Sequence, residues 1–324
     1  MDYHIVKDNT ITKGYYVIDT MQTNLLFIVK EDTIIFSPEY NESIDSNLLS
    51  HYKKVIFGDH ELDESLFDKY KTCEFIHEKY KSSNFNKSVD SLPKQLTHLT
   101  FGVRFNQCVD NLHEQLTHLT FGHCFNQCVD NLPEQLTHLT FGRCFNQCVD
   151  NLPRKLIHLT FGHCFNQLVD NLPEQLTHLI FDFSFNQQVN NLPRQLTHLI
   201  FSDVFNQHVD NLPGQLTHLT FGNRFNQSID NLPNNIEELE FEMFFNLELN
   251  NLPISIKSIS FSRYSNYDKE LNCLPNFVKL IQLPYNYDKK ILKIPKSLNK
   301  VICSKDYKFI EDFHNLNVEI YKNI

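Results

Sequence analysis

A motif of twenty residues repeats about nine times in succession through the middle of this chain of 324 residues. The segment 131–150 reads NLPEQLTHLTFGRCFNQCVD, and the next segment, 151–170, reads NLPRKLIHLTFGHCFNQLVD. The dipeptide Phe-Asn recurs every twenty residues from Phe85 to Phe245. A fixed period of this length is typical of a solenoid, in which each repeat packs only on its neighbours. The repeat therefore constrains the architecture more than any other feature of the sequence does.

Within each repeat, the run LTHLTF has the alternation of a short strand. In the unit 116–135, Leu119 and Phe121 are apolar and lie two positions apart. Successive side chains of a strand point to opposite faces, so we expect these two to point into the core and His118, Thr120 and Gly122 to point outward. Stacking the repeats in register gives a parallel sheet with strands about 4.8 Å apart.

The rest of the repeat carries the chain back to the next strand. Phe125, Val129 and Leu132 are spaced as on a helix, but the segment is short and rich in Asn, Asp and Pro. Pro133 favours an extended conformation at Leu132, and the chain contains no Ala, the best helix former. We expect a turn or a short 3₁₀ segment followed by extended chain. The expected core consists of Leu99, Phe101, Phe105, Val109 and Leu112 and their equivalents.

The pattern L-x-x-L-x-F-x-x-x-F-N resembles the leucine-rich repeat. The combination FNQ…LP…LTHL, clear over residues 85–255, more closely resembles the FNIP repeat family of amoebae and of large viruses that infect them. In the family's name motif Ile and Pro follow Phe-Asn, whereas Gln mostly follows here. The resemblance implies a mainly β, leucine-rich-repeat-like right-handed solenoid with one short parallel strand per repeat of about 20 residues.

The pattern also suggests how the chain is organised. We expect an N-terminal β cap over residues 1–33, divergent repeats over 34–84, regular repeats over 85–262, and divergent C-terminal repeats with a cap over 263–324. A cap is needed because an exposed sheet edge recruits other chains. Continuous periodicity favours one elongated domain of roughly thirteen repeats.

One column of Asn follows the inward Phe and is expected to form a structural ladder. A stacked Asn can satisfy both its own amide and the backbone of the bend, whereas Gln127 is expected to point to water. The Asp column at Asp130 offers oxygen ligands, but a straight column does not converge on a calcium ion. The ladder residues are Asn106, Asn126, Asn146, Asn166, Asn186, Asn206 and Asn226.

Seven His recur at one outward position of the strand. In a parallel sheet their rings come close enough to stack or to share a metal ion. Three interpretations remain open: a stacked column that duplication copied without a role, a contact surface for a partner, and a metal site. The residues are His98, His118, His138, His158, His178, His198 and His218.

The copies differ at the third, fourth and eighth positions counted from the strand Phe. Such tolerance indicates side chains outside the core. The third and fourth positions follow the strand and line one rim, whose residues either vary freely or carry partner specificity. Among these residues, Arg104, Arg143 and Arg224 join the His column as candidate partner-binding residues.

Composition limits the partners. The net charge of −10 and the pI of about 5.9 disfavour nucleic acid. No apolar run reaches the roughly 18 residues that cross a bilayer, and residues 1–10 lack a signal-peptide pattern. We therefore expect an intracellular monomer, in the host cytoplasm if the protein is viral. Nine Cys in repeating columns are expected to be reduced thiols, although pairs such as Cys124 and Cys128 leave a metal or an adventitious disulfide open.

These features favour a non-enzymatic scaffold that binds a protein or peptide through the outward sheet face and the adjacent rim. We expect no catalytic residue, cofactor or metal, because the His and Cys lie in columns that imply no enclosed pocket. The resemblance suggests one alternative, a substrate-recognition arm of a ubiquitin ligase assembly. Residues 1–40 lack an F-box pattern, so that role needs a partner in trans. A structural or decoy protein is the other alternative.

Overall fold

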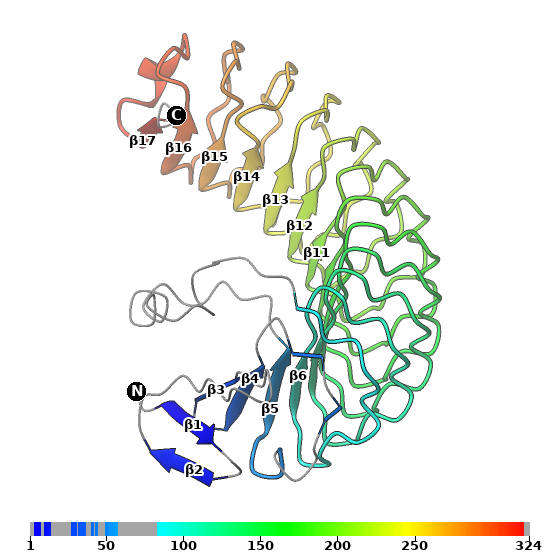
Figure 1. The fold of residues 1–324 in the computed structure, drawn as a ribbon. Helices are drawn as coiled ribbons and strands as arrows, with labels where there is room; N and C mark the ends of the chain where they lie inside the picture. Colours follow the sequence, from blue (N-terminus) through cyan, green and yellow to red (C-terminus); the bar gives the residue numbers. More distant parts are fainter. Residues whose placement is uncertain are drawn as a thin grey trace. The chain divides into compact units, whose positions relative to one another are not determined.

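A computed structural model of the chain describes residues 3–7, 10–13, 27–30, 32–36, 40–41, 43–44, 49–57 and 83–320. The chain divides into two compact units. The first consists of Met1–Leu156 with Thr160–Gly162, and the second of Ile157–Leu159 with His163–Ile324. In each unit the parallel strands follow one another in sequence order (Figure 1).

In the first unit, three antiparallel strands precede a parallel series. Strand β1 (Tyr3–Lys7) pairs with both β2 (Thr10–Lys13) and β3 (Phe27–Lys30). Strand β3 pairs antiparallel with β4, and from β4 onward the strands are parallel. The parallel strands are β4 (Thr33–Phe36), β5 (Lys54–Phe57), β6 (His98–Thr100), β7 (His118–Thr120) and β8 (His138–Thr140).

In the second unit, which includes His158 and Leu159 of β9, the strands from β10 to β17 form one parallel series. Figure 1 shows β11 to β17 in a curved row, with the strands on the inner side and the return segments on the outer side. A 3₁₀ helix, η2 (Ile310–Phe313), precedes the last strand. The strands are β9 (His158–Thr160), β10 (His178–Ile180), β11 (His198–Ile200), β12 (His218–Phe221), β13 (Glu238–Phe241), β14 (Ser258–Phe261), β15 (Leu280–Gln282), β16 (Lys300–Cys303) and β17 (Asn317–Ile320).

The core contains two stacked columns of Phe. Phe101 and Phe105 stack face to face within one repeat, with ring centroids 3.7 Å apart. Each also stacks on its equivalent in the next repeat, Phe101 on Phe121 at 5.7 Å and Phe105 on Phe125 at 6.1 Å. All five residue positions predicted for the core are at most 8% exposed in the repeat 99–112. The predicted solenoid with one short parallel strand per repeat is confirmed.

The second Phe column changes to Tyr toward the end of the chain. Tyr267 stacks on Phe245 with centroids 6.1 Å apart, and Tyr287 and Tyr307 continue the column. All three rings are at most 4% exposed. Burial raises the pKa of each Tyr hydroxyl above its usual value.

The divergent repeats before residue 85 differ from the expectation in one respect. Phe57 and Phe85 stack with centroids 3.8 Å apart, as Phe101 and Phe105 do within one repeat. Strand β5 pairs directly with β6. Phe57 and Phe85 therefore take the two Phe positions of one repeat, whereas the sequence predicts separate divergent repeats over 34–84. Residues 58–82 themselves lie outside the described part of the chain.

Apart from η2, the return segments of the described repeats consist of turns and extended chain. Leu116 and Leu136 each close a turn by donating their N–H to the carbonyl three residues earlier, at 3.1 Å. In the described ranges, no helix has the length and apolarity needed to cross a membrane.

Candidate interaction surface

The outward side of the strands carries the His column. In the first unit, His98, His118 and His138 stack with ring centroids 4.1 and 4.2 Å apart. In the second unit, the four rings from His158 to His218 stack at 4.1 to 4.2 Å. All seven are half-buried. The column therefore forms a ribbon of imidazole edges in each unit, accessible to solvent along its length.

A Thr before most of these His orients the imidazole ring. The hydroxyl of Thr197 donates to the carbonyl of Thr177 at 3.1 Å and lies 2.9 Å from Nδ1 of His198. A hydroxyl has one proton, and the carbonyl takes it, so Nδ1 must donate to the Thr oxygen. The same pattern joins Thr217 and His218. In the neutral ring, Nε2 is therefore the hydrogen-bond acceptor.

The surroundings of the column disfavour protonation at two of its members. Burial lowers the pKa of His198, and the charge of His218 lowers it further, while Glu238 opposes the shift. Burial and the charge of Lys54 likewise lower the pKa of His98. A protonated ring at these positions loses hydration and meets like charge.

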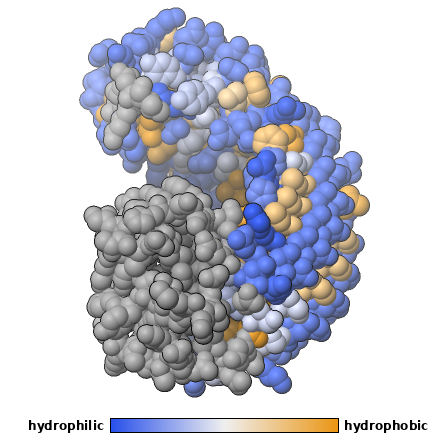
Figure 2. Space-filling view, in the orientation of Figure 1, coloured by the Kyte–Doolittle hydropathy of each residue, from blue (hydrophilic) through white to orange (hydrophobic). Residues whose placement is uncertain are grey.

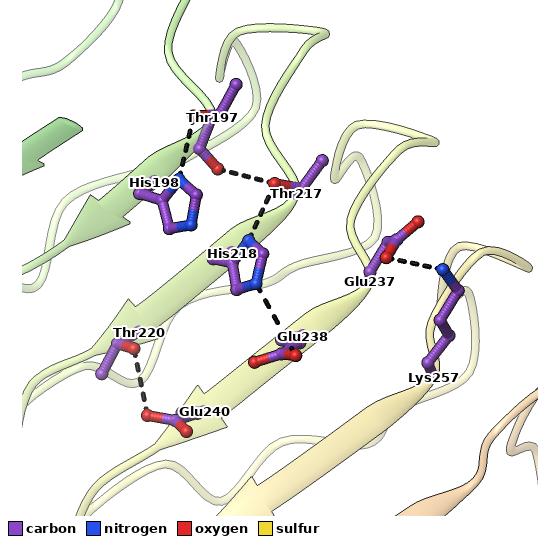
Figure 3. Close-up of polar contacts among 9 residues, drawn as sticks. All are labelled: Thr197, His198, Thr217, His218, Thr220, Glu237, Glu238, Glu240 and Lys257. Carbon is purple, nitrogen blue, oxygen red and sulfur yellow. Dashed lines mark hydrogen bonds and ion pairs between the residues drawn. The ribbon is translucent and has the colours of Figure 1, made fainter. Parts of the chain in front are cut away.

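At β13 the chemistry of the face changes from imidazole to carboxylate. Glu238 takes the register position of His218 on the next strand, and its Oε1 lies 3.6 Å from His218 Nε2 (Figure 3). Glu240 accepts a hydrogen bond from Thr220 at 3.1 Å. Sequence reasoning missed both carboxylates, although the replacement of LTHLTF by IEELEF at the same register was a usable signal.

An ion pair borders these carboxylates. Glu237 and Lys257 lie 2.6 Å apart where β13 and β14 begin (Figure 3). The hydrogen bond from Lys257 lowers the pKa of Glu237. Both side chains are exposed, so the pair contributes little to stability. Lys257 is also the first of several Lys in this part of the unit.

The rim that follows the strands carries the variable positions, and none of their side chains is buried. Their expected location outside the core is confirmed. Arg104 and Arg143 are exposed in the first unit, and Arg224 in the second. On the side shown in Figure 2, hydrophilic residues cover most of the described surface, with hydrophobic residues interspersed among them.

An aromatic cluster on this rim of the second unit was not anticipated. The guanidinium carbon of Arg263 lies 5.2 Å from the ring centroid of Tyr264 and 5.7 Å from that of Tyr285. These distances allow cation–π attraction with both rings. Tyr264 is 62% exposed, and Phe244 holds an exposed position on the same rim one repeat earlier. Phe261 takes the register position of Phe241, so Arg263 and Tyr264 hold the third and fourth positions counted from the strand Phe, a signal that the sequence already offered.

The Asn column is hydrogen-bonded from repeat to repeat. Oδ1 of Asn126 accepts the backbone N–H of Asn146 at 2.9 Å and the side-chain amide of Gln147 at 3.1 Å. Gln127 likewise donates to both oxygens of Asn106. The expectation that Gln127 points to water was wrong. The Gln side chain is one methylene group longer than that of Asn and therefore reaches the Asn of the preceding repeat.

The exposed Cys of the repeats are thiols. Cys108 donates to Oδ2 of Asp110 at 3.0 Å, and this hydrogen bond raises the pKa of the thiol. Eight Cys in the described part of the chain are free. Among the described residues, no three His, Cys, Asp or Glu side chains gather where they could hold a metal ion.

Comparisons with known proteins agree with this geometry. The family model of the FNIP repeat matches six overlapping segments that together span residues 85–264. CroV588, described as a novel circular leucine-rich-repeat protein, is 35% identical in sequence over 87% of this chain, with a TM-score of 0.65. The match covers 48% of CroV588, so this chain spans about half the length of that protein.

A second solved structure shares the fold alone. An internalin, InlF from Listeria monocytogenes, is 15% identical over 90% of this chain and 87% of its own, with a TM-score of 0.51. Among curated proteins, none shows significant sequence similarity to this chain.

Proposed function

We propose a binding function for this chain, which belongs to the FNIP repeat family. Its leucine-rich-repeat-like scaffold places one strand per repeat at a fixed spacing, so that side chains on the strand face and the adjacent rim are presented in rows. Solenoids of this kind offer extended surfaces for protein or peptide partners. The partner in this proposal is a protein or peptide, and the scaffold carries out no chemical reaction.

One observation carries the proposal: a constant backbone presents side chains whose chemistry changes along the second unit. The face changes from imidazole at His218 to carboxylate at Glu238. The rim then gathers Arg263, Tyr264 and Tyr285. Tyr and Arg are among the residue types enriched at the few positions that dominate binding energy in interfaces. A surface of this composition is better suited to specific recognition than a uniform one.

A binding assay with surface variants tests the proposal. The chain, immobilised, is used to capture proteins from a eukaryotic lysate, in parallel with a strand-face variant, Glu238→Lys with Glu240→Lys, and a rim variant, Tyr264→Ser. A matched control, Glu114→Lys with Glu174→Lys, makes the same charge change at exposed turn positions. We expect one stoichiometric partner that the control retains and the face or rim variant loses.

Two results contradict the proposal. Capture of the same proteins by every variant would mean that the face and the rim do not select a partner. The absence of any stoichiometric partner would favour the structural or decoy role. If the captured partner is a ubiquitin-ligase subunit, the scaffold acts as a substrate-recognition arm in trans.

We extend the proposal to location and assembly. An intracellular monomer is consistent with the free thiols in the described part of the chain, because reducing compartments keep Cys unpaired. Light scattering coupled to size exclusion measures the mass, and the 38.3 kDa of one chain is the expected value.

A further inference from the structure

The charge of the chain is distributed unevenly. From Lys257 to Lys308 the sequence has eleven Lys and Arg and only four Asp and Glu, although the whole chain carries a net charge of −10. This segment contains β14, β15 and β16 of the second unit. The end of an acidic protein is therefore locally basic.

Part of this charge gathers on one rim, formed by the turns that precede β14, β15 and β16. The N–H of Lys279 donates to the carbonyl of Lys257 at 2.7 Å, and that of Ser297 to the carbonyl of Asn276 at 3.2 Å. These bonds join the three turns edge to edge. We name this surface the lysine rim, comprising Ile254, Lys257, Phe277, Lys279, Leu292, Lys293, Ile294 and Lys296.

The lysine rim is also apolar. Ile254 is 73% exposed, Phe277 61% and Leu292 68%. In the regular repeats the turn before the strand carries polar residues, such as Glu134 and Gln135 at the positions of Ile254 and Ser255. Neighbouring exposed apolar side chains of this size are typical of a contact surface.

Its positive charge is largely uncompensated. Residues 251–260, 271–282 and 291–303 contain no Asp or Glu. Lys257 pairs with Glu237 at 2.6 Å, and the charge of Lys279 also acts on that carboxylate. Within the described residues, however, no carboxylate forms an ion pair with Lys279, Lys293 or Lys296. A partner with carboxylates can therefore form new ion pairs here.

We propose that the lysine rim is a second interaction surface, which binds an acidic peptide segment with apolar side chains in a protein partner. The carboxylates meet Lys279, Lys293 and Lys296, and the apolar side chains cover Ile254, Phe277 and Leu292. Complementary charge orients the partner and raises the association rate, and burial of apolar side chains supplies affinity.

The charge on the adjoining strand favours a peptide over a membrane. Glu237, Glu238 and Glu240 lie on β13 and just before it, beside the lysine rim. A bilayer of anionic lipid is a broad negative surface that extends over these carboxylates as well, and like charges repel within the screening length of about 8 Å at physiological salt. A short peptide can remain on the rim.

The test uses the whole chain and a displayed library of random peptides. Selection on the wild type is expected to enrich peptides that combine Asp or Glu with Leu, Ile or Phe. The affinity of a selected peptide is then measured by fluorescence anisotropy for Lys293→Glu with Lys296→Glu, and for a matched control, Lys305→Glu with Lys308→Glu. Both pairs change the net charge equally, but the control pair follows β16 instead of preceding a strand, and Lys308 lies 3.7 Å from Asp288.

We expect the rim pair to lose about tenfold or more in affinity and the control pair to stay within about twofold of the wild type. A third variant, Phe277→Ser with Leu292→Ser, tests the apolar part and is also expected to weaken binding. Thermal melts establish that each variant is folded.

Several outcomes overturn the inference. Enrichment of basic peptides, no enrichment, or an equal loss in both charge pairs would each contradict it. The wild type could also sediment with phosphatidylserine vesicles while no peptide binds. If the rim pair then lost this sedimentation, the ligand of the lysine rim would be a membrane and not a peptide. The strand-face variants used for the proposed function leave the lysine rim intact, so that failure of one proposal is distinguishable from failure of the other.

Discussion

His218 Nε2 lies 3.6 Å from Glu238 Oε1, where the imidazole column of the second unit meets the first carboxylate. Because Nδ1 of His218 donates to the hydroxyl of Thr217, Nε2 has no proton in the neutral ring. The contact becomes an ion pair only when the ring is fully protonated. On the preceding strand, burial lowers the pKa of His198, and the charge of His218 lowers it further, whereas Glu238 opposes the shift.

Acid should destabilise the fold through His98 and His198. Both have a pKa below the ordinary value, so the unfolded chain binds protons more readily than the folded one. Their contribution to stability is complete above the unfolded pKa of about 6.5 and is lost as the pH falls below it. We expect the melting temperature of the wild type to fall further between about pH 7.5 and about pH 5.5 than that of a His98→Gln, His198→Gln double variant.

The control for this experiment is His208→Gln, which removes an exposed His outside the column. It should retain the wild-type response to acid. An equal loss in the wild type and the double variant would show that the column does not couple stability to pH.

The Asn ladder should contribute more to stability than the Gln beside it. Asn126→Ala removes the acceptor of a backbone N–H and of Gln147, and we expect a loss of about 1–3 kcal/mol in unfolding free energy. Gln127→Ala removes only a donor, because Asn106 still accepts from the backbone of Asn126, and should cost about 0.5–1.5 kcal/mol. Denaturant unfolding of both variants measures the difference, and a greater loss for Gln127→Ala would contradict this ranking.

Two Gly of the second unit should respond oppositely to Ala. A Cβ on Gly222 would lie 2.0 Å from the carbonyl oxygen of Ser202 in the preceding repeat, whereas a Cβ on Gly214 has no atom within 4 Å. Ser202 shows that the turn can hold a side chain after a shift, so we expect Gly222→Ala to cost about 1–3 kcal/mol. Gly214→Ala should be neutral or stabilising by up to about 1 kcal/mol. Similar melting temperatures for the two variants would count against close packing of the turns.

The Tyr column offers a second opposed pair. The hydroxyl of Tyr267 is buried and has no hydrogen-bond partner among the described residues, whereas that of Tyr287 donates to the carbonyl of Lys269 at 3.0 Å. Tyr267→Phe should raise the unfolding free energy by about 1 kcal/mol, and Tyr287→Phe should lower it by about 1 kcal/mol. Calorimetry of the two variants measures both changes. Destabilisation by Tyr267→Phe would mean that the hydroxyl is satisfied in solution.

The sequence by itself determined the solenoid, the strand positions and the core. Phe101 and Phe121 could be assigned to one buried column because each repeat meets nearly identical neighbours, so a pattern within one repeat also describes the packing between repeats. The same reasoning placed the His column on the outward face and the variable positions on the rim.

The tertiary structure alone decided contacts that depend on how divergent segments meet. Phe57 and Phe85 stack across residues 58–82, and a sequence cannot distinguish such an interruption from a worn repeat. Arg263 meets Tyr264 and Tyr285, where the spacing of the repeats has changed. Gln127 enters the Asn ladder because the reach of a side chain, not its polarity, determines its partner. Periodicity predicts contacts only where neighbouring repeats have nearly the same sequence. Where the repeats diverge, the contacts depend on interatomic distances that only the tertiary structure provides.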